Sequence, residues 1–492
     1  MLLTIDIGTS VFKSALWDHE GNRLSYASVP LSVIDDGIKY ETDPSAWLLA
    51  FEDCCIKLQS GLKRLPDKNG GHLGDVQALV LSGNGPTLVP VFKGKNAPNT
   101  GSNFFIPEAG NARLWLNRRN TEKTLEYSRV VTELMDGFVD SCFFLPGILG
   151  IKNDETPLYH NTKFFLGCPE YLAYALTGEA KTVFPSDGFD RWFWNGGVLE
   201  KLDMDAQKFP PFIRPGSPFG LLLPSAARRF GLPEKIPVIS GGPDFFAAIL
   251  GSGVKEPGQI CERTGSSDGV NVCTKDRIIH EKLMSYGHPV EPYWNLSAVI
   301  NTTGKAIEWG RDVLGLPGFE EFFMLAKESG PGSEGVFFLP FLAGGRADDS
   351  AMHGAWRNLS LSCGRSGLAN SILEGICFAI RDNILAMREA GAFTGETSSA
   401  GQLHVTGGLA ANAALNQMKA DITGRQVIEP LHKEAELLGL AVIGACYLGK
   451  YTSYAQASCA MYQIQKRYDP NPGNMNLYDD LFSIYKQFKL RN

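Results

Sequence analysis

The sequence opens with an apolar run that contains a single carboxylate, Asp6. Residues 1–7 have the pattern of a buried strand, residues 8–10 are a Gly-Thr-Ser turn, and residues 11–17 resume a strand pattern. This pattern predicts a β-hairpin with a glycine and two hydroxyls at its tip. Backbone N–H groups and hydroxyls at such a tip can bind an anion, and Asp6 could hold Mg²⁺. An ordinary hairpin with a buried aspartate fits this stretch equally well.

Strand and helix patterns alternate through the first half of the chain. Pro44 and Ser45 mark the start of a helix, because apolar residues recur at helical spacing after them. Residues 77–81 are a further buried strand pattern, and a polar loop that contains Asn84 follows directly. Open α/β sheets bind ligands at the carboxyl ends of their strands, which makes this loop a candidate binding element. Its glycines and proline would also suit a simple turn.

Two further segments of the first half combine polar and aromatic residues. Residues 115–119 contain Trp115, an amide, and the guanidinium of Arg119, which together suit a polyhydroxylated ligand. An amphipathic helix start with solvated arginines is at least as consistent with that segment alone. Residues 184–194 are dense in aromatic side chains and fit either a packed loop over a cleft or a surface covering.

The middle of the chain contains the candidate base, Asp244. Residues 236–240 form a short apolar strand pattern, a Gly-Gly-Pro turn follows, and residues 245–250 are small and apolar, as in a helix. Asp244 is therefore predicted at a helix N-terminus. Such an aspartate usually caps the helix, but in a water-poor site it can take a proton from a substrate hydroxyl.

A second glycine-serine turn follows within residues 259–271, between two strand-like runs. It resembles the opening hairpin, and two such hairpins in successive domains suggest a duplicated fold that holds one polyphosphate. The same residues fit the GxSxG pattern of a hydrolase nucleophile elbow centred on Ser267. That elbow requires a helix after the turn, whereas residues 270–274 have a strand pattern.

The last third supplies a candidate nucleotide pocket. A helix pattern follows Gly304, and a strand pattern at residues 404–408 ends in two glycines before a helix pattern at residues 411–423. Glycines there would let a base or ribose lie against the backbone, and Asn412 could donate to it. A tight strand–helix turn is an equally good interpretation. His404 is expected in the core strand, and neither a GxxxxGK[ST] loop nor a GxGxxG fingerprint after a strand is present.

Composition limits the class of protein. The length of 492 residues predicts two large domains, which we place at 1–250 and 251–492. A charged fraction of 20% and a net charge of −7, without a long basic run, argue against nucleic acid and membrane partners. No targeting segment or membrane-length apolar run is evident, and ten scattered cysteines without CxxC pairs suit a reduced, cytoplasmic protein.

Taken in order, DIGTS, GGPD, TGSS, TGKAIEW, FLPFLAGGR, ILEG and VTGGLAANAALNQMKADITG resemble the FGGY carbohydrate kinases, and among them the xylulokinases. The resemblance implies an α/β fold of two ribonuclease-H-like, actin-like ATPase domains with an interdomain cleft that binds ATP and Mg²⁺. It implies sugar and phosphate binding by the first domain and nucleotide binding by the second. A small sugar or polyol would be the partner, and a homodimer is inferred from the family alone.

The resemblance also assigns roles to individual residues. Asp244 matches the catalytic base, and Asp6 matches the metal-associated aspartate. The remaining matches are Gly8, Thr9, Ser10 and Lys13 in the first phosphate loop; Gly265 and Ser266 in the second; Gly304 and Glu308 in a nucleotide segment; Gly408 and Asn412 at adenosine; and Asn84, Trp115, Arg119 and Asp244 at the sugar.

The sugar side departs from the family pattern. Residues 83–87 stand where xylulokinase-like members have GQMHG, and Asn117 replaces the aspartate of WxDxR. The second phosphate loop also has an additional acidic residue, Asp268. The expected function is ATP-dependent phosphorylation of a ketose or polyol hydroxyl, with a xylulose-like sugar as first candidate. The alternatives are a catalytically silent, ATP-binding actin-like scaffold or sensor, and a serine hydrolase that uses Ser267.

Overall fold

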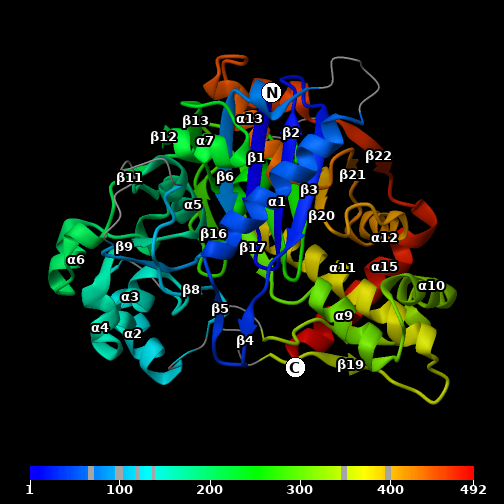
Figure 1. Ribbon diagram of the computed structural model, residues 1–492. Coiled ribbons are helices and arrows are strands. Elements are labelled where there is room, and N and C mark those ends of the chain that lie inside the picture. Colours follow the sequence, from blue (N-terminus) through cyan, green and yellow to red (C-terminus); the bar gives the residue numbers. More distant parts are fainter. Residues whose placement is uncertain are drawn as a thin grey trace. The chain divides into compact units, whose positions relative to one another are not determined.

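The computed structural model describes residues 1–64, 71–94, 104–117, 119, 121–135, 139–344, 352–393 and 401–491. The chain forms two compact units (Figure 1). The first comprises Met1–Gly251 together with Glu436–Met461, and the second comprises Ser252–Ala435 together with Tyr462–Asn492. The first unit thus combines the first 251 residues with a segment of the second half of the chain. Whether sugar and nucleotide binding divide between 1–250 and 251–492 stays a prediction.

A six-stranded sheet forms the centre of the first unit, and the opening hairpin lies within it as predicted. Its strand β1 pairs antiparallel with β2 and parallel with β6, and β13 is parallel to β6. In spatial order the strands are β12 (Pro218–Leu221), β13 (Pro237–Pro243), β6 (Ala78–Gly83), β1 (Leu2–Ile7), β2 (Val11–Trp17) and β3 (Arg23–Pro30).

Helices cover both faces of this sheet. The predicted helix start at Ser45 is confirmed by α1 (Ser45–Leu62), which packs on β2 and β3. On the opposite face, Gly444 of α13 lies against the side chains of Leu2 and Val80. The helices of this unit are α1, α2 (Thr121–Leu134), α3 (Phe144–Asp154), α4 (Thr156–Asn161), α5 (Cys168–Thr177), α6 (Gly196–Lys201), α7 (Pro224–Phe230), α8 (Asp244–Gly251), α13 (Ala435–Tyr447, all but its first residue) and α14 (Tyr454–Met461).

Short strands and an aromatic cluster complete the first unit. The aromatic segment 184–194 is packed: Phe189 and Trp192 are buried, and Phe189 stacks on Phe245 with ring centroids 5.7 Å apart. The short strands are β4 (Ile34–Asp35), β5 (Tyr40–Thr42) and β8 (Ala112–Arg113) in one sheet, β7 (Val89–Phe92) with β9 (Thr162–Leu166), and β10 (Thr182–Val183) with β11 (Phe212–Ile213).

The second unit has a seven-stranded sheet that repeats the pairing pattern of the first. Strand β14 pairs antiparallel with β15 and parallel with β20, as β1 does with β2 and β6. This repetition is the duplicated fold expected from the two hairpins. In spatial order the strands are β16 (Met284–Gly287), β17 (Trp294–Ile300), β15 (Asp268–Thr274), β14 (Ile260–Thr264), β20 (Leu403–Gly407), β21 (Val427–Pro430) and β22 (Ile464–Tyr468).

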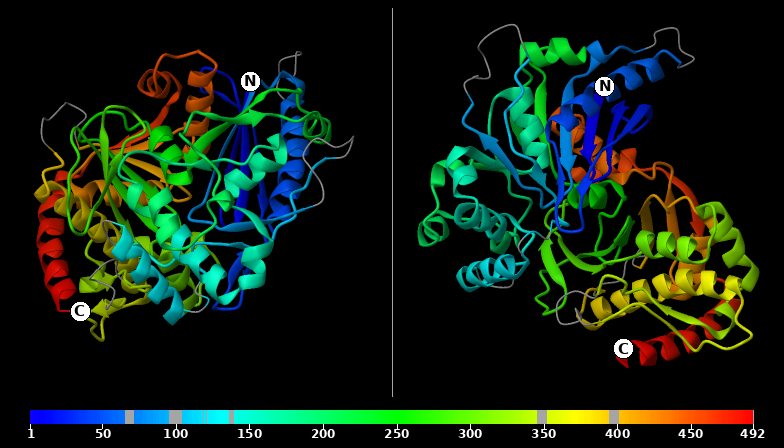
Figure 2. Two further views of the ribbon diagram at one scale, coloured as in Figure 1. Left: turned by 90° about the vertical axis from the view of Figure 1, so that its left-hand side faces the viewer. Right: turned by 60° about the horizontal axis from the view of Figure 1, so that its bottom comes forward.

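Five helices and a two-stranded sheet surround this second sheet in the described part of the chain. The long helix α11 is buried over most of its length, and α15 lies beside it, as Figure 2 shows in yellow and red. The bounds are α9 (Gly304–Val313), α10 (Phe319–Ser329), α11 (Arg365–Glu389), α12 (Ala413–Thr423) and α15 (Pro472–Leu490), with β18 (Phe337–Leu339) and β19 (Ala355–Arg357).

Two findings bear on the expectations from composition. Within the described part of the chain, no helix combines the length and the apolar character that a membrane crossing requires. None of the ten cysteines, which all lie within the described residues, forms a disulfide, and six of them are buried.

His404 lies in the core of the second unit, as predicted. It is buried in β20, and its Nδ1–H donates to the carbonyl oxygen of Ser252 at 2.9 Å. Burial lowers the pKa of His404 from 6.5 to about 4, so the folded protein keeps the imidazole neutral where the unfolded chain takes up a proton. Folding stability should therefore fall as the pH drops from about 6.5 towards 4, by about 2 kcal/mol at pH 5 from this residue.

Thermal melting of a His404→Asn variant tests this expectation. Its midpoint should change less between pH 7 and pH 5 than that of the unmodified protein, because the variant has no imidazole to protonate on unfolding. His160→Asn is the matched control, since His160 is exposed. Equal pH dependence of the His404 variant and the unmodified protein would contradict the burial argument.

Candidate active site

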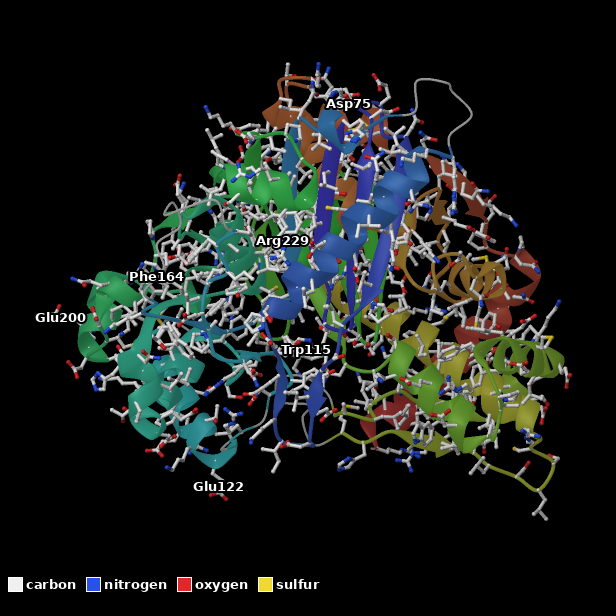
Figure 3. The ribbon with its side chains drawn as sticks, in the orientation of Figure 1. Asp75, Trp115, Glu122, Phe164, Glu200 and Arg229 are labelled. Atoms are coloured by element: carbon white, nitrogen blue, oxygen red, sulfur yellow. The ribbon has the colours of Figure 1, made fainter. Side chains whose placement is uncertain are left out.

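The first turn joins β1 to β2 and requires glycine at its first position. The Gly8 N–H donates to the Val11 carbonyl at 3.1 Å, and a Cβ on Gly8 would lie 2.6 Å from that oxygen. Thr9 is half-buried and Ser10 is exposed. Thr9 Oγ1 accepts a hydrogen bond from Trp115 Nε1 at 3.3 Å, so a predicted sugar residue contacts the predicted phosphate turn. Figure 3 shows Trp115 near β5.

Asp6 lies at the carboxyl end of β1 and is buried between neighbours on both adjacent strands. Lys13 on β2 and Ser82 on β6 are its partners in register, and Ser82 Oγ donates to Asp6 Oδ1 at 3.0 Å. Burial raises the pKa of Asp6 to about 7, Lys13 opposes this increase, and the nearby Glu436 and Asp244 add to it. Asp6, Asp244 and Glu436 are therefore close enough to interact electrostatically. Sequence reasoning missed Glu436 because it returns to this unit from the second half of the chain.

Asp244 has the strand–turn–helix setting that the sequence predicts. It follows β13 directly and is the first residue of α8, and Gly242 makes the bend at a φ of 78°. Asp244 is half-buried, and its Oδ1 accepts the Phe245 N–H at 2.6 Å. A helix N-terminus is a favourable place for an acidic side chain such as that of Asp244. Pro243 pairs with Gly83, which brings Asp244 to the same sheet edge as Asp6.

The other predicted sugar residues have partners within the protein. Asn84 is buried: its Nδ2 donates to the Ile7 carbonyl at 2.9 Å, and its Oδ1 accepts from Thr87 Oγ1 at 2.7 Å. Arg119 forms an ion pair with Glu41 at 2.5 Å. Asn84 thus shapes its own loop, and the charge of Arg119 is balanced. Arg118 lies outside the described residues.

Three residues that sequence reasoning missed complete this ion-pair group. Arg113 Nη2 contacts both carboxylate oxygens of Glu155, at 2.6 and 2.7 Å, and Arg119 lies 3.8 Å from Glu155. Glu41 faces Arg113 across the β5–β8 pairing. Burial lowers the pKa of Arg113, and Glu155 counteracts that shift. Two arginines are thus matched by two glutamates.

The second turn lies between β14 and β15 and is covered on one side by the start of α9. Gly265 and Ser266 are exposed. The Gly304 N–H donates to the Gly265 carbonyl at 3.1 Å, and the Thr303 and Lys305 N–H groups donate to the Ser266 carbonyl at 3.1 and 3.3 Å. A Cβ on Gly304 would lie 2.3 Å from the Gly265 carbonyl oxygen, so only glycine allows this contact.

The remaining nucleotide candidates lie on α9 and around the end of β20. Glu308 forms an ion pair with Lys305 at 2.7 Å and is partly exposed. Gly408 is exposed with no atom within 4 Å of an added Cβ. Asn412 caps α12, because its Oδ1 accepts the Leu415 N–H at 3.0 Å. Thr264 and Gly407 are paired, so the ends of β14 and β20 lie side by side.

The predicted strand after the second turn is confirmed by β15 (Asp268–Thr274), and the geometry also places Asp268. Ser267 lies in a strand–turn–strand hairpin, and the strand–turn–helix of a nucleophile elbow is not formed there. Asp268, the additional acidic residue of the second loop, is buried and has a pKa raised well above its usual range by that burial. Its carboxyl group is therefore not a surface charge at the turn.

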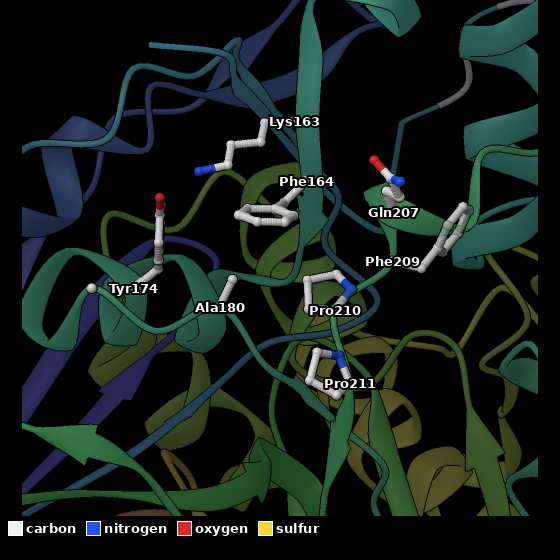
Figure 4. Close-up of a pocket in the computed structure, with 9 residues that line it drawn as sticks. Lys163, Phe164, Tyr174, Ala180, Gln207, Phe209, Pro210 and Pro211 are labelled. Atoms are coloured by element: carbon white, nitrogen blue, oxygen red, sulfur yellow. The ribbon is translucent and has the colours of Figure 1, made fainter. Parts of the chain in front are cut away.

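The first unit also contains a cavity of about 290 Å³ away from these residues. Figure 4 shows its wall, which includes Lys163, Phe164 and Tyr174 but none of the predicted site residues. The candidate site rests instead on the sheet edge that carries Asp6 and Asp244, and on the two turns.

Comparison with known proteins gives matches along both units. The N-terminal domain model of the FGGY family of carbohydrate kinases matches residues 1–251, and the C-terminal domain model of that family matches residues 263–448. The chain belongs to the FGGY family of carbohydrate kinases. It is therefore a sugar phosphotransferase that uses ATP, as the motif order predicted, and the silent scaffold and serine hydrolase are not favoured.

Individual FGGY kinases resemble the chain over nearly its whole length. The xylulose kinase of Staphylococcus epidermidis is 26% identical over 99% of this chain and 96% of its own. A gluconate kinase structure from Lactobacillus acidophilus has a TM-score of 0.82 at 18% identity, covering 100% of this chain and 97% of its own. A ligand-bound xylulose kinase structure from that organism has a TM-score of 0.81 at 18% identity, with 100% and 98% coverage. The actin-like two-domain fold is thereby established.

Proposed function

We propose that this FGGY kinase transfers the γ-phosphoryl group of ATP to a hydroxyl of a ketose or polyol, with Asp244 as the catalytic base. The observation that carries the proposal is the meeting of Asp6, Ser82 and Asp244 at the carboxyl ends of β1, β6 and β13. Parallel strands of α/β sheets bind ligands at this edge. A partly exposed carboxylate held at a helix N-terminus can accept a proton there.

The proposed reaction assigns a role to each candidate residue. Asp244 accepts the proton of the sugar hydroxyl while the oxygen of that hydroxyl bonds to the γ-phosphorus. The bond between the γ-phosphorus and ADP breaks in the same step. The backbone and hydroxyls of Gly8, Thr9 and Ser10, with Lys13, would hold phosphate from the first unit. Gly265 and Ser266, exposed in the second turn, would hold phosphate from the second unit. Gly304, Glu308, Gly408 and Asn412 would bind the nucleoside part.

The residues around Asp6 fit a hard divalent cation. Asp6 supplies an oxygen donor, and Glu436 and Asp244 lie near enough to raise its pKa. Among the described residues, no three His, Cys, Asp or Glu side chains converge closely enough to hold an ion alone. This suits Mg²⁺, which protein sites bind through one or two carboxylates, with water and substrate phosphate as further ligands. When bound, Mg²⁺ would neutralise charge on the phosphates.

The ion pairs near Trp115 favour an uncharged sugar. In the described part of this region, Arg113 and Arg119 are matched by Glu41 and Glu155, which leaves no net positive charge for a sugar acid. A xylulose-like ketose is our first candidate, because the curated relative from Staphylococcus epidermidis is a xylulose kinase.

ADP release with Mg·ATP across ketoses, polyols, deoxysugars and aldonic acids tests the proposal. We expect one neutral ketose or polyol to raise turnover well above a sugar-free blank. A flat panel despite bound ATP would contradict the kinase proposal and support the scaffold. Selective turnover of an aldonic acid would overturn the preference for an uncharged sugar while keeping the kinase.

Asn412 offers a test that separates capping from adenosine binding. Asn412→Asp keeps an oxygen that can accept the Leu415 N–H but removes the amide donor. We therefore expect unchanged thermal stability and an ATP KM raised about tenfold, the value of one lost hydrogen bond. Asn412→Ala should also lose about 1 kcal/mol of stability, because the cap is removed. An unchanged ATP KM for Asn412→Asp would show that Asn412 caps the helix and does not bind adenosine.

A further inference from the structure

A charged cluster is completely buried beneath the second turn. Lys419 and Glu262 are both 0% exposed, and Lys419 Nζ lies 2.7 Å from Glu262 Oε1. Lys419 also donates to Thr264 Oγ1 at 3.3 Å, and the Thr264 hydroxyl donates to Glu262. Asp268 is the fourth member, 1% exposed and in electrostatic contact with Glu262 and Lys419.

The protonation of the cluster follows from its burial. Burial and the neighbouring charge of Glu262 raise the pKa of Asp268 well above its usual range. Glu262 and Lys419 form an ion pair. Lys419 outweighs the effect of burial on Glu262 and lowers the pKa of that carboxyl group, and the Glu262 carboxylate in turn raises the pKa of Lys419. Asp268 is therefore the neutral acid, and its O–H can be donated to Glu262. The cluster carries one positive and one negative charge.

The positions of these residues relate the cluster to the proposed nucleotide site. Thr264 is the last residue of β14 and Asp268 is the first of β15, so the cluster holds both ends of the turn formed by residues 265–267. Lys419 comes from α12, which follows Gly408 and is capped by Asn412. One buried contact thus joins the element with the phosphate candidates to the element with the adenosine candidates.

Stability alone does not explain this arrangement. A buried ion pair generally stabilises no more than apolar residues of similar volume, because desolvation offsets the attraction. A buried pair does fix geometry, since its partners tolerate little displacement once water is excluded. The cluster therefore sets where the second turn lies relative to α12.

We propose that Lys419, Glu262 and Asp268 are positioning residues for ATP, which keep the turn at residues 265–267 and the start of α12 at the separation that one nucleotide requires. The inference rests on the proposed nucleotide role of these two elements. None of the three side chains would contact ATP. Their effect would be on nucleotide affinity, with sugar affinity unchanged.

The double variant Glu262→Gln/Lys419→Met tests this role, because it removes both buried charges together. A single substitution would leave one buried charge without its partner and would destabilise the fold. We expect the double variant to melt near the unmodified protein, its ATP Kd by calorimetry to rise about tenfold or more, and its sugar KM to stay unchanged.

Glu374→Gln is the matched control in the same unit. Glu374 is also a buried carboxylate, and it accepts from Ser333 Oγ, the Gly332 N–H and Tyr478 at 2.5, 2.8 and 3.0 Å. It makes none of the contacts of the Lys419 cluster. We expect a lower melting temperature with an unchanged ATP Kd.

Three outcomes decide the inference. An ATP Kd that rises in the double variant but not in Glu374→Gln supports the inference. An unchanged ATP Kd in the double variant overturns it. If the double variant does not fold, Thr264→Val removes the hydroxyl that contacts Glu262 and Lys419 and keeps the shape of the side chain. A severalfold rise in the ATP Kd of Thr264→Val would then support the inference, and an unchanged Kd would overturn it. Absence of ATP binding by the unmodified protein would instead overturn the proposed nucleotide function itself.

Discussion

Asp244→Asn should reduce sugar-dependent ADP release by about a thousandfold, within the range that a general base contributes. Asparagine keeps the shape of the side chain and an oxygen for the Phe245 N–H, but it cannot accept the proton of the sugar hydroxyl. ATP and sugar binding should persist, because neither depends on the basicity of Asp244. Initial rates with the best sugar of the panel, together with ligand-dependent shifts in melting temperature, measure both effects.

Asp187→Asn is the control for this substitution. Asp187 belongs to the same unit, is 74% exposed and pairs with Arg214 at the surface. The Asp187→Asn substitution should leave turnover unchanged. Near-full turnover by Asp244→Asn would show that another group takes the proton, and the assignment of Asp244 as the base would then be wrong.

Gly304→Ala should raise the ATP KM at least tenfold and lower the melting temperature. The new methyl carbon would lie 2.3 Å from the Gly265 carbonyl oxygen and 3.2 Å from its carbon, and both atoms belong to the backbone. Either the second turn or the start of α9 must therefore move. Because the predicted phosphate contacts lie on that turn, the displacement should weaken nucleotide binding more than sugar binding.

Gly196→Ala is the matched control, because Gly196 is also the first residue of its helix and is exposed. An added Cβ there would have no atom within 4 Å. We expect no change in melting temperature or ATP KM. An unchanged ATP KM for Gly304→Ala, measured with the sugar at saturation, would show that the second turn is not part of the nucleotide site.

The local elements of the fold could be predicted because their signals are local. The first hairpin follows from apolar runs on either side of a Gly-Thr-Ser turn, and the position of Asp244 follows from a strand, two glycines and an apolar helix. His404 is followed by strand residues and two glycines, which identified it as a core residue. In each case, neighbouring residues decide the structure, so a single sequence is sufficient.

The ion-pair partners could not be predicted because they come from distant positions. Glu41 lies opposite Arg113 in the pairing of β5 with β8. These strands have three and two residues, which is too short for a periodic pattern in the sequence. Lys419 lies in an otherwise ordinary helix pattern, and only the tertiary fold shows that its side chain is buried beside Glu262. The residue type of Arg119 suggests a sugar ligand, but it does not indicate the ion pair with Glu41, which depends on the assembled unit.

The return of Glu436–Met461 to the first unit has a consequence for synthesis of the protein. Gly439 of α13 lies against the backbone of α8, and Gly444 lies against Leu2 and Val80, so this late helix covers a face made from the earliest residues. The ribosome completes Gly251 and must add 184 further residues, 252–435, before Glu436 appears. During that interval an apolar surface of the first unit has no covering helix. The nascent chain should therefore depend on chaperones or on rapid completion to avoid aggregation at this face.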